Sequence, residues 1–108
     1  MSGSPQIVLC TVPDRDTAEM IAGTLVSDRQ AACVNIIPGL TSVYRWQGKT
    51  EQSDELLLII KTTETAYESA QATISRLHPY ELPEIIAVSI QNGLPEYLDW
   101  LTTSLETP

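Results

Sequence analysis

The sequence predicts an α+β fold, a ferredoxin-like βαββαβ sandwich whose antiparallel sheet has the strand order 4-1-3-2, followed by an extra C-terminal helix. Two observations predict it. Short apolar, β-branched runs alternate with segments of helical periodicity in the order β-α-β-β-α-β. A further segment with the apolar periodicity of a helix follows the last strand.

The first strand and the first helix are predicted over the opening third of the chain. Residues 6–12 form a β-branched apolar run that ends at Pro13. Asp14 or Asp16 is expected to cap the helix that follows, which should end near residues 28–29. The residues of its apolar stripe recur at helical spacing and are Ala18, Ile21, Ala22 and Leu25.

A long hairpin is predicted next. The strand over residues 31–37 is interrupted by the Pro-Gly pair at 38–39, which indicates a bulge or bend. The strand resumes at residue 41, and residues 47–48 make a tight turn. In the return strand, residues 50–55 are polar and residues 56–60 are apolar, so its first half should project beyond the sheet.

A second helix, a short fourth strand and a last helix complete the pattern. Thr63 or Thr65 is expected to cap the second helix, which must stop before Pro79. Residues 85–90 predict the fourth strand, and Pro95 suits the first turn of the last helix. The predicted apolar stripes are Ala66, Ala70, Ile74 and Leu77 in the second helix and Leu94, Tyr97, Leu98, Leu101 and Leu105 in the last.

Both faces of the predicted sheet are apolar. Residues 7–9, 56–60 and 85–88 are hydrophobic at odd and even positions alike, whereas a sheet covered on one face alternates with polar residues. The last helix is expected to cover part of the second face, and another copy of the chain the rest. The alternative is that short central strands of a small domain are simply apolar.

Length and charge restrict the functional classes. The chain has 108 residues, so we expect a single domain over residues 6–105 behind a flexible tail at 1–5. Six basic residues against 14 acidic ones give a net charge of −8, which argues against nucleic acid and membrane partners. With no basic, apolar leader and only two cysteines, the protein is expected to be cytoplasmic.

The predicted topology brings chemically active residues together. Antiparallel pairing of the first and fourth strands places Cys10 and Thr11 beside the loop at residues 78–84, which carries His78, the only histidine. The third strand separates Cys10 from Cys33 by about 9–10 Å, so a disulfide within one chain is not expected.

Five segments in register resemble the divalent-cation tolerance protein family CutA. They are Leu9-Cys10-Thr11-Val12-Pro13, Ala31-Ala32-Cys33-Val34-Asn35, Ser42-Val43-Tyr44-Arg45-Trp46-Gln47-Gly48-Lys49, Lys61-Thr62 and His78-Pro79-Tyr80-Glu81-Leu82-Pro83-Glu84. The resemblance runs from about Ile7 to Leu101. It implies a cytoplasmic homotrimer, linked to copper tolerance, whose hairpins extend onto neighbouring subunits.

The resemblance also implies a metal site made of Cys10, His78 and Glu84. A thiolate with an imidazole favours copper or zinc over magnesium or calcium. The residues themselves leave simpler roles open. Cys10 has the properties of a small core residue, His78 suits a helix C-terminus, and Glu84 suits a strand start. We therefore expect copper to bind weakly, with other divalent metals undecided.

Two other protein families have a similar architecture or fold. The nitrogen-signalling PII proteins share the trimeric architecture, so a small-molecule sensor or signalling adaptor is the alternative function. The sequence has no glycine-rich phosphate loop. Acylphosphatases share the fold, but Arg15 lacks a glycine-rich cradle. A single histidine provides no catalytic triad, so we expect a non-enzymatic protein.

Overall fold

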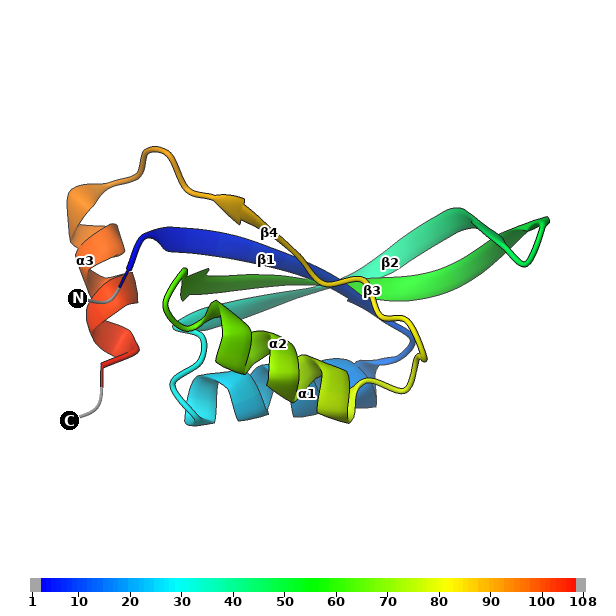
Figure 1. Ribbon diagram of the computed structural model, residues 1–108, viewed down its shortest axis with the longest axis horizontal. Helices are drawn as coiled ribbons and strands as arrows, with labels where there is room; N and C mark the ends of the chain where they lie inside the picture. Colours follow the sequence, from blue (N-terminus) through cyan, green and yellow to red (C-terminus); the bar gives the residue numbers. More distant parts are fainter. Residues whose placement is uncertain (1–2, 107–108) are drawn as a thin grey trace.

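The computed structural model describes residues 3–106 and confirms the expected order of elements (Figure 1). The elements are β1 (Pro5–Val12), α1 (Arg15–Ser27), β2 (Cys33–Trp46), β3 (Lys49–Thr63), α2 (Tyr67–Leu77), β4 (Ile86–Ser89) and α3 (Pro95–Ser104). The sheet has the order β2-β3-β1-β4, and every neighbouring pair is antiparallel. This is the predicted order read from the other edge.

Helices α1 and α2 pack side by side over one face of the sheet and enclose the core (Figure 1). Alternate residues of β1 and β3 point toward them, as the two-residue period of a strand requires. The fully buried core side chains include Val8, Cys10 and Val12 from β1, Leu58 and Ile60 from β3, Ile21 and Leu25 from α1, and Ala70 and Ile74 from α2.

The two helices begin differently. Asp14 caps α1, because its carboxylate accepts the backbone N–H of Thr17 at 2.8 Å, and this hydrogen bond lowers the pKa of Asp14. No side chain caps α2, so the prediction of a threonine cap was wrong. β3 continues as far as Thr63, whose hydroxyl accepts the N–H of Ala66 at 3.3 Å in the turn before the helix.

The β2–β3 hairpin projects well beyond the rest of the sheet, as predicted (Figure 1). Its register shifts between Ile37 and Leu40, where the Pro-Gly pair was expected to produce a bulge. The turn at its tip consists of Gln47 and Gly48, with φ of 50° and 80°. Both values lie in the left-handed region, which two-residue hairpin turns require.

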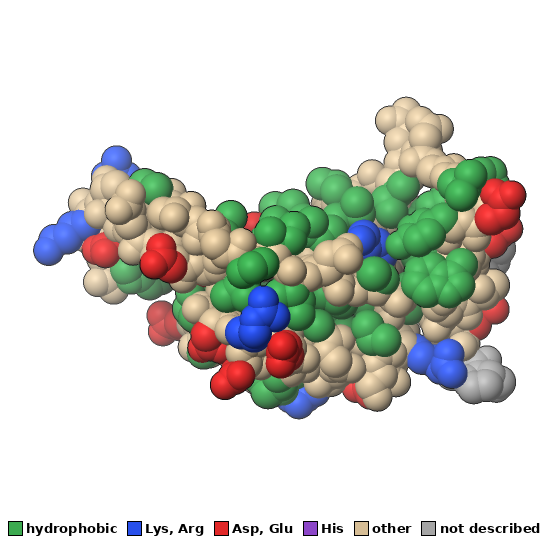
Figure 2. Space-filling view, turned by 180° about the vertical axis from the view of Figure 1, so that it is seen from behind, with side chains coloured by type: hydrophobic (Ala, Val, Ile, Leu, Met, Phe, Trp, Pro, Cys, Tyr) green, Lys and Arg blue, Asp and Glu red, His purple; other side chains and the backbone are tan. Residues whose placement is uncertain are grey.

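The sheet face away from α1 and α2 carries a row of exposed apolar side chains. Ile86 and Val88 of β4 are about half exposed, at 51% and 50%. They pair with Leu9 and Ile7 of β1, which point to the same face. Figure 2 shows hydrophobic side chains gathered between the projecting hairpin and α3. We call this surface the open face.

Helix α3 lies at the end of the sheet where β1 begins, and it contacts β1 and β3 (Figure 1). Arg29 fixes its end by donating to the carbonyls of Ser104 and Glu106, at 3.3 and 3.2 Å. Leu101 is its one fully buried residue among those described, whereas Trp100 is 47% exposed. The last helix therefore leaves the β4 part of the open face uncovered.

Of the tail predicted at 1–5, residues 1–2 lie outside the described residues, and Pro5 is already the first residue of β1. Within residues 3–106, no helix is long and apolar enough to cross a lipid bilayer.

Candidate functional site

The end of β1 and the 78–84 loop are joined through His78, as the topology predicts. His78 follows α2 and is buried, with 7% of its surface exposed. Its Nδ1 accepts the backbone N–H of Tyr80 at 3.2 Å, so this nitrogen carries no proton. Nε2 then donates to the carbonyl oxygen of Thr11 at 2.7 Å. Both ring nitrogens are therefore used in holding the loop against β1.

Cys10 lies in the core and not on the surface. Its side chain is fully buried, and the neighbouring Thr11 lines a pocket on the other side of the strand. Burial raises the pKa of the Cys10 thiol to about 12, with smaller contributions from the charges of Glu84 and Glu55. Cys10 is therefore a neutral thiol at physiological pH. Cys33 is also a free thiol.

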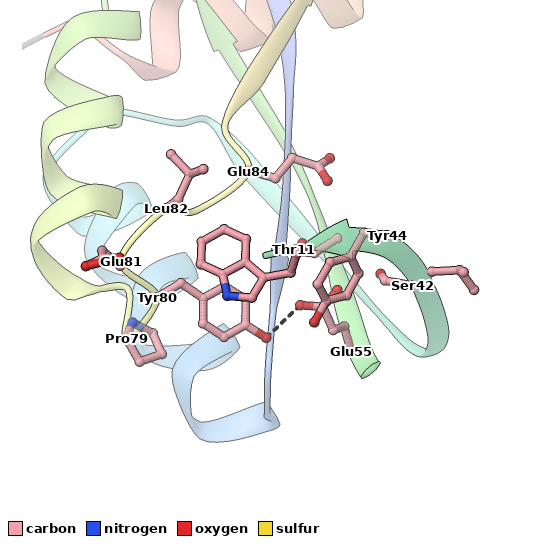
Figure 3. A pocket seen from close by; sticks show the side chains of 11 residues that line it. Thr11, Ser42, Tyr44, Glu55, Pro79, Tyr80, Glu81, Leu82 and Glu84 are labelled. Carbon is pink, nitrogen blue, oxygen red and sulfur yellow. Dashed lines mark hydrogen bonds between the residues drawn. The ribbon is translucent and has the colours of Figure 1, made fainter. Parts of the chain in front are cut away.

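Glu84 lines a pocket of about 700 Å³ between the β2–β3 hairpin and the 78–84 loop (Figure 3). The pocket combines aromatic and acidic side chains with a few small polar and apolar ones. It is lined by Thr11, Ser42, Val43, Tyr44, Trp46, Glu55, Pro79, Tyr80, Glu81, Leu82 and Glu84.

A hydrogen bond between Tyr80 and Glu55 crosses the pocket. The Tyr80 hydroxyl donates to Oε2 of Glu55 at 2.7 Å, and Figure 3 shows the two side chains directed toward each other. Glu55 is 6% exposed. Burial, the hydrogen bond to Glu55 and the charge of Glu55 all raise the pKa of Tyr80. The pocket thus holds a neutral phenol against a buried carboxyl group.

The structure brings the three predicted metal ligands to one region but does not gather their donor atoms. Thiolate, imidazole and carboxylate are suitable copper ligands. However, Cys10 points into the core, the nitrogens of His78 are both hydrogen-bonded, and Glu84 lies in the pocket. Among residues 3–106, no three His, Cys, Asp or Glu residues lie close enough to hold an ion. The proposed ligand set thus remains a prediction.

Glu55 was not among the site residues predicted from the sequence. Its position carries a weak signal, because it is the last polar residue before the apolar run of β3. An acidic side chain at that boundary was expected to lie in the projecting part of the hairpin. Instead, the 78–84 loop folds over it and buries it against Tyr80.

The comparisons with known proteins agree over nearly the whole chain. Residues 6–104 match the family described as CutA1 divalent ion tolerance protein. A "divalent-cation tolerance protein CutA" of Thermus thermophilus is 53% identical over 96 residues, which cover 89% of this chain and 93% of the relative.

Solved structures give the same result. CutA from Xylella fastidiosa superposes with a TM-score of 0.94 at 45% identity, over 96% of this chain and 100% of that one. A CutA from Archaeoglobus fulgidus, described as a periplasmic divalent cation tolerance protein, gives a TM-score of 0.92 at 35% identity, over 94% and 99%. This chain is therefore a member of the CutA1 family of divalent ion tolerance proteins.

Proposed function

We propose that the protein is a non-enzymatic homotrimer that binds divalent metal ions, copper among them, in the cytoplasm. Membership of a family named for divalent-cation tolerance supports a role with metal ions. The net charge of −8 favours association with cations over anions. Two free thiols are compatible with a reducing compartment.

The open face supports assembly. Exposed apolar side chains on β4, with their neighbours on β1, form a continuous surface that water solvates poorly. The projecting hairpin adds exposed Val43, Tyr44 and Trp46, and aromatic residues of this kind are enriched at subunit interfaces. These three side chains also line the pocket, so the pocket would lie beside the proposed interface. A three-fold arrangement is what the resemblance to the family implies.

The single observation that supports the metal site is the contact between the 78–84 loop and the end of β1. The bond from His78 to Thr11 places the imidazole beside the residue that follows Cys10. The charge of Glu84 raises the pKa of the Cys10 thiol, so the carboxylate of Glu84 lies within electrostatic range of the sulfur. Cys10 must lose a proton and His78 must release a hydrogen bond before either can serve as a ligand. We therefore expect weak copper binding.

Substitution of the ligands tests the metal site. Cys10→Ser and His78→Gln are each expected to lower copper affinity about tenfold or more, since loss of even a residue that only supports a metal ligand costs about 10- to 100-fold. Cys33→Ser is the matched control, since it removes the other thiol and should leave the affinity unchanged. Titration of each assembled variant with copper measures the effect. Wild-type affinity in the first two variants would exclude these residues as ligands.

The pocket supports a second candidate function, a small-molecule sensor. Its volume of about 700 Å³ lies within the range of small-molecule sites.

A further inference from the structure

The pocket beside Glu55 is acidic and has no cation of its own. Among the described residues that line it there are three glutamates and no lysine, arginine or histidine. Glu55 is 6% exposed, and its one described partner is the neutral Tyr80 hydroxyl. A carboxylate buried without a counter-charge is costly, so a cation entering the pocket would be stabilised.

The walls of the pocket are suited to an organic cation. Tyr44 and Trp46 come from β2 and Tyr80 comes from the loop, so aromatic rings approach from both sides. Aromatic faces attract ammonium groups, and the attraction is strongest at tryptophan. Val43 and Leu82 add aliphatic surface against which methylene groups can pack.

The spacing of the carboxylates favours an extended ligand over a single metal ion. Glu55 lies on β3 and Glu84 at the end of the loop, and Figure 3 shows them at separate places around the pocket. No three acidic, histidine or cysteine residues among those described come close enough to share one ion. A volume of about 700 Å³ also exceeds what a bare ion fills.

We propose that this pocket binds a linear aliphatic polyamine, with one ammonium group at Glu55 among the rings of Tyr80 and Trp46 and another toward Glu84. The alkyl chain between the charges lies against the apolar walls. The proposal gives a ligand class to the second candidate function and does not depend on metal binding. Glu55 is its critical residue, and Glu55 is not among the predicted metal ligands.

Spermidine is the probe, and calorimetric titration of the full-length, assembled protein at low salt is the measurement. Glu55→Gln keeps an oxygen for Tyr80 but removes the charge, so it is expected to weaken binding about 10- to 100-fold. Trp46→Ala is expected to weaken binding about fivefold or more, and Trp46→Phe should retain most of the affinity. Added salt should also weaken binding.

Glu64→Gln is the matched control. Glu64 is an exposed glutamate that directly follows the last residue of β3 and does not line the pocket, so its substitution should not affect binding. Sedimentation of each variant shows whether assembly is preserved. Absence of spermidine binding by the wild-type protein overturns the proposal, as does unchanged affinity in an assembled Glu55→Gln variant. Binding of Mg²⁺ as tight as that of spermidine would show that charge alone determines binding, and would also overturn the polyamine proposal. None of these results affects the copper titrations, so the two proposals fail separately.

Discussion

Val88→Glu is expected to convert the proposed homotrimer to monomers at micromolar concentration. Val88 lies on the edge strand β4 beside Ile7, on the open face, and is 50% exposed in a single chain. Assembly would bury it. A carboxylate forced into an apolar interface without a partner costs several kcal/mol, and every 1.4 kcal/mol changes an association constant about tenfold. Sedimentation velocity measures the outcome.

Met20→Glu is the matched control for this substitution. Met20 is an apolar residue of α1 with 45% of its surface exposed, but it lies away from the open face, and glutamate is a good helix former. It is expected to leave assembly unchanged. A Val88→Glu protein that sediments like the wild type would exclude the β4 part of the open face as the interface.

His78→Ala is expected to lower the free energy of unfolding by about 2–4 kcal/mol, because it removes the hydrogen bonds by which the imidazole ties two backbone groups together. Those groups are the carbonyl of Thr11 and the N–H of Tyr80, which the imidazole now bonds at 2.7 and 3.2 Å. Loss of the buried ring adds a cavity. Urea unfolding at one fixed protein concentration measures the change, since the proposed assembly would contribute to stability.

Tyr80→Phe separates the role of His78 from that of the pocket. It removes the hydroxyl bond to Glu55 but leaves both bonds of His78, so a smaller loss of about 1 kcal/mol is expected. If His78→Ala is as stable as the wild type, the imidazole does not hold the loop, and its two nitrogens are free for other roles.

Most of the fold was predictable because local signals and topology agree. The polar and then apolar halves of β3 predicted the projecting hairpin, and Pro38-Gly39 predicted its irregularity. The start of α2 was not predictable from Thr63 and Thr65, because pairing with β1 extends β3 through Thr63. α3 has an apolar stripe, but its position at the end of the sheet depends on contacts such as Arg29 to Ser104.

The region of the candidate site was predictable, but its side-chain geometry was not. Strand pairing alone places the 78–84 loop beside β1. Which face a side chain occupies depends on register, and a shift of one residue reverses it. That register turns Cys10 into the core and leaves Thr11 on the pocket side. The burial of Glu55 by Tyr80 is a contact between residues 25 positions apart, which no local pattern encodes.

A native mass spectrum of the full-length protein, recorded before and after addition of copper, tests the central claim most directly. It reports the number of chains and the bound metal together. We predict an ion of about three times the 11.9 kDa chain mass that gains up to one copper per chain. A folded monomer at micromolar concentration, or a trimer that takes up no copper, would contradict the claim.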